Sequence, residues 1–408
     1  MGKVRVRHVK MRAGAPVPLK PPDTTQGSRF PLSQLYLFSA AMALPIVHSL
    51  EACADYTNTV EPFLEQLYSL PDDFVTALSS GSVARLYVET NPLVSGFAIS
   101  LALGFVFLVV SEINRNYSQV DRCWSLLPTV YIAHFNLWSR LAGAHSGRLD
   151  AALLFSTIWS IRLTYNYARK GGYDVGSEDY RWEIVKNAVP KWLFHIFNLT
   201  FIAFFQSVLL FAIAAPAYTL LLTGTIERDL TFADAAFAAV EICIVAFEYV
   251  ADQQQWDYQT AKYKYRGSGK VPAGFDKSTL DRGFLAEGLW AYSRHPNFAA
   301  EQSVWIVLYQ WSCYATGTLY SWAGIGALVL VLLFQGSTAL TERITSGKYP
   351  GYREYQKQVG MFVPTSVVGF KTPAPKVLRT SEVAKKQAEK EATASGSYSY
   401  NTRSAAKR

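Results

Sequence analysis

The sequence predicts an all-α membrane protein, a polytopic bundle of about eight transmembrane helices. The chain of 408 residues is 50% hydrophobic and 14% aromatic but only 17% charged, whereas about a quarter of a typical soluble chain is charged. Apolar stretches recur that are long enough to cross about 30 Å of hydrocarbon, and positive charge gathers on alternate connections between them. This composition argues against a soluble enzyme and against intrinsic disorder.

The apolar stretches define the predicted spans. They cover residues 32–50, 93–110, 123–142, 151–167, 194–222, 233–250, 299–315 and 319–334. The second is the most uniformly apolar, and Pro128 interrupts the third. The fourth contains Arg162 near its end, from which a long side chain can reach the membrane surface.

The charge pattern orients these spans. Residues 1–31 carry seven Lys and Arg against one Asp, and residues 369–408 carry nine against three Glu. The net charge of +8 therefore belongs to the tails, which excludes a basic nucleic-acid-binding core. The connection 51–91 is acidic, whereas 168–192 and 251–298 are basic. With eight spans, every basic segment falls on the cytoplasmic side.

We therefore expect four regions. Residues 1–31 form a basic cytoplasmic tail, 32–111 hold the first spans with an acidic lumenal loop, 112–365 form a membrane domain, and 366–408 form a disordered basic cytoplasmic tail. The four cysteines lie far apart without metal-ligand spacing, so we expect small buried hydrophobic side chains and no metal site.

Carboxylates inside a predicted span are the first functional signal. Glu241, Glu248 and Asp252 are spaced by seven and four residues, and Gln255 and Gln259 continue the series. At 3.6 residues per turn these five side chains share one helix face, which cannot look at lipid. A structural polar seam accounts for the glutamines, whereas Glu248 and Asp252 are candidates for chemistry.

The segment 288–301 is the second signal. Pro296 suits a first helical turn, so Arg294 and His295 lie at the start of the seventh span. A helix N-terminus with free N–H groups and a neighbouring cation can bind an anion. Asn297 and Glu301 follow on one helix face. Anchoring of Arg294 to lipid headgroups is the alternative, although it leaves those two polar residues unexplained.

The segment 341–355 combines basic residues with three tyrosines. Arg343, Tyr352 and Tyr355 suit a nucleotide, with the cation at phosphates and the rings at a base. An interfacial amphipathic segment is equally compatible. The chain has neither a Gly-rich dinucleotide fingerprint nor a phosphate-binding loop, so helices would have to hold any nucleotide.

These motifs together resemble a known family. Ser293-Arg-His-Pro-Asn-Phe-Ala-Ala-Glu301, followed by Glu342-Arg and by Lys348-Tyr-Pro-Gly-Tyr-Arg-Glu-Tyr355, resembles the C-terminal domain of the steroid 5-alpha-reductase superfamily. The resemblance is greatest to its poorly characterised branch of multi-span membrane proteins and runs over about residues 112–365. That branch shows similar patterns at Val120-Asp-Arg-Cys-Trp124, Trp159-Ser-Ile-Arg-Leu163, Glu178-Asp-Tyr-Arg-Trp182 and Glu248…Asp252-Gln-Gln254.

The resemblance implies an NADPH-dependent reductase of a C=C bond in a lipid-like substrate (sterol, isoprenoid or enoyl), in the endoplasmic reticulum. Hydride would add to one carbon of a polarised alkene, and an acid would serve the other carbon or the carbonyl. The acid candidates are Glu248, Asp252 and Tyr292. The cofactor candidates are Arg294, His295, Asn297, Glu301, Arg343, Tyr352 and Tyr355.

Two other functions fit the same motifs. Isoprenylcysteine carboxyl methyltransferases, which use S-adenosylmethionine, carry a similar Arg-His-Pro pattern, so a methyltransferase acting on a membrane lipid or prenylated acceptor is the first alternative. A non-catalytic membrane scaffold is the second. Phe298 stands where the family usually has Tyr, which leaves a stacking role but no hydroxyl. The expected partners are membrane lipids and a hydrophobic small molecule, not nucleic acid.

Overall fold

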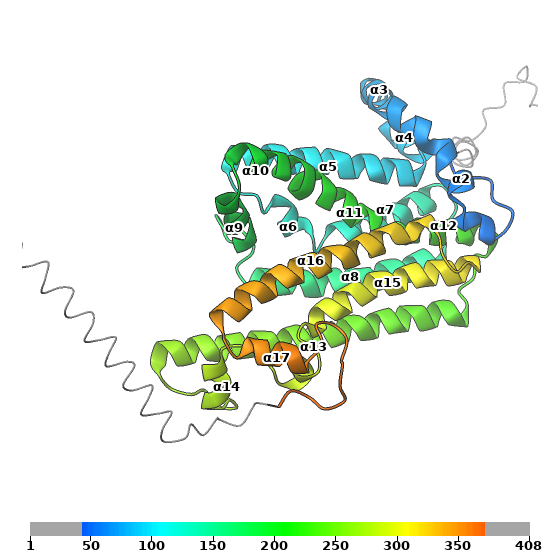
Figure 1. The fold of residues 1–408 in the computed structure, drawn as a ribbon. Coiled ribbons are helices and arrows are strands. Elements are labelled where there is room, and N and C mark those ends of the chain that lie inside the picture. The colour runs from blue at the N-terminus through cyan, green and yellow to red at the C-terminus, as the bar shows by residue number, and fades with distance from the viewer. Residues whose placement is uncertain (1–42, 372–408) are drawn as a thin grey trace, which may run out of the picture. The chain divides into compact units, whose positions relative to one another are not determined.

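The computed structural model describes residues 43–371, and every regular element in this range is helical (Figure 1). The one sheet-like feature among these residues is an isolated bridge between Ser293 and Gly360. The prediction of an all-α protein is therefore confirmed for this part of the chain. Residues 1–31, the tail from residue 372 and most of the predicted span 32–50 lie outside the described residues. Residues 43–50 are turn and irregular, so that span does not reach residue 50.

The chain divides into two compact units. The first contains the described residues up to Ala239 together with Ile306–Leu328, and the second contains Val240–Trp305 together with the described residues from Val329. Three helices, α13, α15 and α16, have one part in each unit.

The first unit begins with helices where the sequence predicted a loop. The segment 51–91 contains two 3-10 turns, Glu51–Ala54 and Glu61–Phe63, and the helices α2 (Tyr56–Thr59), α3 (Leu64–Ser80) and α4 (Val83–Glu89). Gly81, at φ 69°, ends α3 in the left-handed conformation that glycine adopts without strain. The Asn91 side chain accepts a hydrogen bond from the Leu93 amide and so caps the next helix.

The rest of the first unit is a helical bundle. Its helices are α5 (Pro92–Asn114), α6 (Gln119–Cys123), α7 (Leu127–Leu141), α8 (Gly147–Arg169), α9 (Tyr180–Ala188), α10 (Lys191–Phe197), α11 (Gln206–Ala212) and α12 (Pro216–Ile226), with a π-helical stretch, Asn198–Phe205, between α10 and α11. Large side chains such as Trp138, Trp159 and Phe155 are fully buried between them. The start of α16 approaches α11 closely at Gly326, where an added Cβ would lie 2.2 Å from the Ala212 backbone.

A buried ion pair holds the first turn of α13 within this unit. Arg148 Nε lies 3.1 Å from both carboxylate oxygens of Asp234. Asp234 also accepts hydrogen bonds from the Thr231 amide and from Trp311 Nε1 at 2.8 Å each. These donors meet the hydrogen-bonding needs of the buried Asp234 carboxylate. The ion pair therefore has a structural role.

The second unit is built on three long helices. They are α13 (Phe232–Ser268), α15 (Pro296–Thr316) and α16 (Ile325–Lys348), joined by the shorter α14 (Lys277–Arg282), a 3-10 turn at Gly288–Ala291, another at Trp322–Gly324, and α17 (Tyr352–Gln358). The predicted loop 251–298 therefore starts inside α13. This helix continues to Ser268 because its sequence contains neither Pro nor Gly before Gly267.

Within residues 43–371, three helical segments are long and apolar enough to cross a membrane: Pro92–Asn114, Lys191–Ile226 and Trp322–Lys348. They contain most or all of the predicted spans 93–110, 194–222 and 319–334. The other predicted spans within the described residues correspond to α7, α8, α13 and α15, which carry more polar side chains. Cys243 is exposed on α13, contrary to the prediction that the cysteines are buried.

Candidate functional site

The carboxylate face of α13 lies in the interior of the protein. Glu241, Glu248 and Asp252 are buried, and Gln255 is partly buried on the same side of the helix. Both carboxylate oxygens of Glu241 lack a hydrogen-bond partner among the described residues. The predicted periodicity therefore places these acids away from lipid, as the cost of exposing a carboxyl group to hydrocarbon requires.

The segment before α15 is held by backbone pairing with a distant part of the chain. The Arg294 amide donates to the Gly360 carbonyl and the His295 amide to the Met361 carbonyl, each at 3.0 Å. These two N–H groups are therefore occupied by the protein. They are consequently not available to an anion, whereas the predicted anion site at the first turn of α15 stays a prediction.

Glu342 of α16 gathers the predicted cofactor residues around one carboxylate. Its Oε1 accepts from Arg294 Nε at 2.6 Å, from His295 Nε2 at 3.0 Å and from the Tyr352 hydroxyl at 3.1 Å. Its Oε2 accepts from Arg294 Nη2 at 3.0 Å and from Gln356 Nε2 at 2.9 Å. We call these five side chains the Glu342 cluster. Their contacts tie the start of α15 to α16 and α17.

Arg294 is almost fully engaged inside this cluster. Besides the two bonds to Glu342, its Nη1 donates to the carbonyls of Gln356, at 3.2 Å, and Val359. A guanidinium has five N–H groups, and four of them are used here. Glu342 and two backbone carbonyls therefore hold the Arg294 guanidinium in place.

The two predicted cofactor tyrosines, Tyr352 and Tyr355, are buried, and the hydroxyl group of each makes a hydrogen bond within the protein. The Tyr355 hydroxyl donates to the Trp290 carbonyl, and both tyrosine rings pack edge-on or tilted against Phe284. Burial raises the pKa of Tyr355 above its usual range, and burial together with the Glu342 carboxylate does the same for Tyr352. Their ring faces are consequently occupied by the protein and not presented to a base.

A second contact joins α13 to α15 beside the cluster. Asn297 Nδ2 donates to Asp252 Oδ1 at 3.0 Å. The other end of this amide, Asn297 Oδ1, is buried without a hydrogen-bond partner among the described residues, and the same is true of Gln255 Oε1. One turn further along α15, Glu301 Oε1 accepts from Trp305 Nε1 at 3.0 Å. Unmatched buried acceptors thus lie beside the predicted acids.

Other predicted residues occupy the surface or stack. Tyr292 is 45% exposed, and Arg343 is exposed on α16. The Phe298 ring stacks on His295, with centroids 5.4 Å apart. The role of Glu342 was missed, although it stands within a quoted motif. The available signal is a single carboxylate near the end of an apolar helix, followed 10 and 14 residues later by Tyr352 and Gln356, which it binds.

The motifs of the first unit form a separate structural contact. The Asp121 carboxylate accepts from Trp182 Nε1 at 2.7 Å, and Arg122 Nη2 donates to the Ser177 carbonyl at 2.6 Å. Glu178 accepts from the Tyr117 amide at 2.8 Å. Burial raises the pKa of Asp121, although part of its side chain still meets solvent. The two motifs therefore bind each other.

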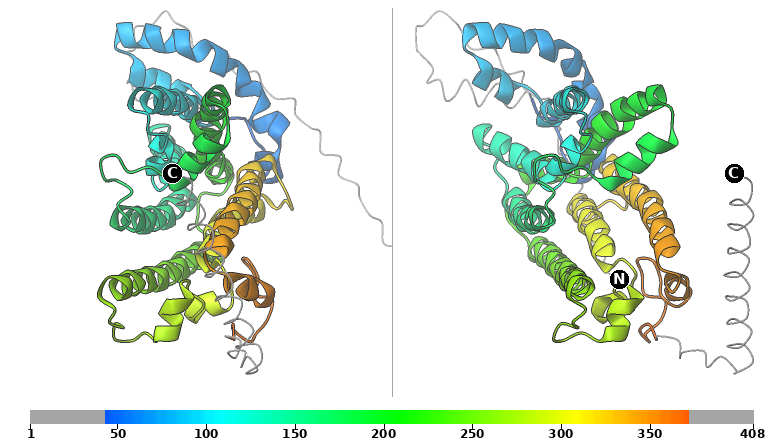
Figure 2. Two further views of the ribbon diagram at one scale, coloured as in Figure 1. Left: turned by 60° about the vertical axis from the view of Figure 1, so that its left-hand side comes forward. Right: turned by 90° about the vertical axis from the view of Figure 1, so that its left-hand side faces the viewer.

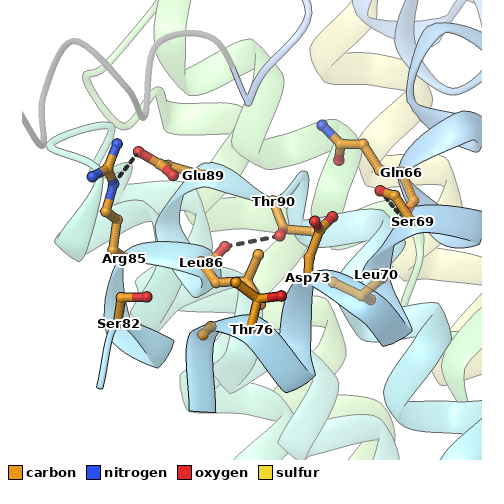
Figure 3. Close-up of a pocket in the computed structure, with 11 residues that line it drawn as sticks. Gln66, Ser69, Leu70, Asp73, Thr76, Ser82, Arg85, Leu86, Glu89 and Thr90 are labelled. Carbon is orange, nitrogen blue, oxygen red and sulfur yellow. Dashed lines mark hydrogen bonds and ion pairs between the residues drawn. The ribbon is translucent and has the colours of Figure 1, made fainter. Parts of the chain in front are cut away.

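A pocket also lies elsewhere in the first unit. It has a volume of 380 Å³ and is lined by polar side chains of α3 and α4 (Figure 3). It contains none of the residues that the sequence predicted to bind a ligand.

Comparison with known proteins places this chain in a family. Residues 107–359 match the family described as "protein of unknown function (DUF1295)". A protein of Schizosaccharomyces pombe, named "Uncharacterized protein C594.04c", is 42% identical over 328 residues, which cover 79% of this chain and 94% of the relative. No solved structure matches the chain. Since the family match covers more than half of the chain and includes the Glu342 cluster and both carboxylates of α13, the chain belongs to the DUF1295 family.

Proposed function

We propose that the protein is a membrane-embedded, NADPH-dependent reductase of a C=C bond in a lipid-like substrate. The observation that carries the proposal is a pair of buried acceptors beside Asp252, Asn297 Oδ1 and Gln255 Oε1, which have no hydrogen-bond partner in the part of the chain that the structure describes. A buried polar group without a hydrogen bond costs about 1–3 kcal/mol. A ligand with donor groups, bound between α13 and α15, would remove that cost.

The chemistry of these residues suits NADPH. The nicotinamide carboxamide is a hydrogen-bond donor that an amide oxygen such as Asn297 Oδ1 can accept. The phosphates need cations, and Arg343 is an exposed cation directly after Glu342. Arg294 fits a different role, since Glu342 and two carbonyls already hold it. We therefore assign Arg294, His295, Tyr352 and Tyr355 to positioning the start of α15, and Asn297 to the ligand.

The acids of α13 supply the proton. NADPH, when bound, provides a hydride to one carbon of the double bond. Reduction of a C=C bond then needs one proton at the other carbon. Glu248, buried one turn before Asp252, is our choice for that donor, and Asn297 holds Oδ1 of Asp252 in place. The burial of both carboxyl groups keeps bulk water from the reacting carbon.

The resemblance to the steroid 5-alpha-reductase superfamily supports the same proposal. We extend it to the topology, with eight spans, both termini cytoplasmic and residence in the endoplasmic reticulum. A chain without native cysteines and with either Glu61→Cys or Lys270→Cys tests this, because both positions are exposed. The two cysteines should react with a membrane-impermeant maleimide from opposite sides of sealed vesicles. Reaction from the same side contradicts the eight-span arrangement.

Ligand-dependent thermal stability tests the cofactor. NADPH at about 100 times its Kd should stabilise the detergent-purified protein by about 2.7 kcal/mol, which appears as a rise in Tm. Asn297→Ala should reduce the rise, while Gln310→Ala, an exposed position on the same helix, should leave it unchanged. A rise with S-adenosylmethionine and none with NADPH would favour the methyltransferase and overturn the proposal.

Turnover tests the proton donor once a substrate is identified. Glu248→Gln keeps the shape of the side chain but removes its proton. The variant should still show the NADPH-dependent rise in Tm, while turnover falls by about 100-fold or more. Wild-type turnover in this variant would move the role to Tyr292.

A further inference from the structure

Helix α3 exposes an apolar face to its surroundings. Its outward side chains are Leu64, Tyr68, Phe74, Val75 and Leu78, which are 40%, 83%, 49%, 67% and 64% exposed. At 3.6 residues per turn they fall on one side of the helix. Such a stripe normally faces the core of a protein, so its exposure needs an explanation.

The opposite face of α3 is largely polar and faces α4. Gln66, Ser69, Asp73 and Thr76 line the pocket of 380 Å³ that α3 shares with α4 (Figure 3). The Gln66 side chain also accepts a hydrogen bond from the Asn91 amide at 2.9 Å. The side of α3 that faces α4 is thus largely polar and the side that faces away from α4 is apolar, which inverts the usual arrangement of an amphipathic helix. An inverted amphipathic helix indicates that the medium outside it is apolar.

The position of α3 identifies that medium. Helix α4 leads directly into α5, Pro92–Asn114, one of the three segments able to cross a membrane. In Figure 1 α5 is seen along its length and α3 nearly end-on. In the right-hand view of Figure 2, α3 is seen along its length and α5 nearly end-on. Helix α3 therefore runs across α5. If α5 crosses the bilayer, α3 lies parallel to the surface of the bilayer.

The charges of α3 select the kind of lipid surface. The helix carries Glu65, Asp72 and Asp73 and no Lys or Arg. Interfacial helices that bind anionic lipids are basic, so an acidic helix would be repelled by them. A leaflet of neutral, zwitterionic lipids fits these charges.

We propose that α3 is an interfacial helix whose Leu64, Tyr68, Val75 and Leu78 side chains insert among the acyl chains of a neutral lipid leaflet. The polar pocket between α3 and α4 then lies on the side of α3 away from the lipid. This inference concerns the first unit alone and holds whether or not the protein reduces a substrate.

A matched pair of spin labels tests the proposal. Val75 and Thr76 are adjacent, exposed and nearly equal in size, but only Val75 belongs to the apolar face. The full chain, with all four native cysteines replaced by Ser, is labelled with a nitroxide at Val75→Cys or Thr76→Cys and reconstituted into phosphatidylcholine vesicles. Collision rates with oxygen, which concentrates in lipid, and with a water-soluble nickel complex report the surroundings of each label.

The expected result is a severalfold higher ratio of oxygen to nickel collisions at position 75 than at position 76. Adding phosphatidylserine to the vesicles should lower the ratio at position 75, because the acidic helix is repelled. Equal nickel access at both positions would place α3 in water and overturn the proposal. Protection of position 75 from both reagents would also overturn it, and dipolar broadening there would identify a second copy of the chain as the cover.

Discussion

The Glu342 cluster makes a strong prediction about stability. Glu342→Gln keeps the size of the side chain but removes the charge that faces Arg294. The wild-type carboxylate accepts five hydrogen bonds, two of them from Arg294 at 2.6 and 3.0 Å. The amide has one oxygen acceptor and places an NH₂ group against donors. Arg294, whose side chain is 9% exposed, is left as a buried cation without its anion.

The size of the effect follows from this burial. Removing one partner of a buried ion pair costs about 3–5 kcal/mol. In a chain of several hundred residues, each kcal/mol changes Tm by about 2 °C, so Glu342→Gln should melt about 6–10 °C lower. The assay is thermal unfolding of the detergent-purified protein followed by tryptophan fluorescence. Because the Trp290 ring packs against His295 of this cluster, with ring centroids 6.4 Å apart, its emission should report the loss.

Two further variants separate the ion pair from a general loss of charge. Glu354→Gln changes an exposed carboxylate that pairs with Lys357 at 3.3 Å, and it should leave Tm unchanged. Glu342→Gln combined with Arg294→Met should cost less than the two single changes added together, because the unpaired cation is gone. An unchanged Tm for Glu342→Gln, or strict additivity in the double variant, would refute a stabilising role for the ion pair between Glu342 and Arg294.

Two other predictions concern the first unit. Gly326→Ala should destabilise the protein by about 1–3 kcal/mol, because the added Cβ would lie 2.2 Å from the Ala212 backbone. Gly336→Ala in the same helix should not destabilise it, because no other atom lies within 4 Å of a Cβ added there. Equal melting temperatures of the two variants would contradict this packing. Asp121→Asn should raise stability more near neutral pH than near pH 4, as measured by Tm. The reason is that burial raises the pKa of Asp121 above its ordinary value of 3.8. Between these two pKa values the folded state holds a proton that the unfolded state releases. The stability of the wild-type protein therefore falls as the pH rises through this window. An identical pH dependence in both proteins would exclude this explanation.

Local sequence patterns predicted the features that depend on periodicity. The helical class, the apolar span of α5 and the shared face of Glu241, Glu248 and Asp252 all follow from hydrophobic spacing within one helix. Helix α3 was missed because its acidic residues are typical of a loop, although its apolar spacing is helical. The apolar side of α3 faces outward, whereas such spacing normally indicates a side that faces a core.

Contacts between distant segments could not be predicted in the same way. The amides of Arg294 and His295 are satisfied by Gly360 and Met361, more than sixty residues away. Likewise, the sequence predicts that Arg294 binds an anion or a lipid headgroup, and the fold shows that Glu342 of its own chain binds it. A single sequence predicts that an arginine lies at a helix start, and only the fold shows that it is buried and which acid binds it.

The hydrogen bonds divide the motif Arg294-His-Pro-Asn297 into two functional halves. Arg294 and His295 are satisfied by Glu342 and by backbone carbonyls, so they fix where α15 begins. Asn297, at the second position of that helix, has one end on Asp252 and the other without a partner among the described residues. A change in the first half should therefore lower stability and ligand binding together. Asn297→Ala should lower ligand binding while Tm of the ligand-free protein stays near that of the wild type, since the variant also removes an unmatched acceptor. If Asn297→Ala instead melts as low as Glu342→Gln, the asparagine belongs to the frame, and the ligand must be sought elsewhere on α13.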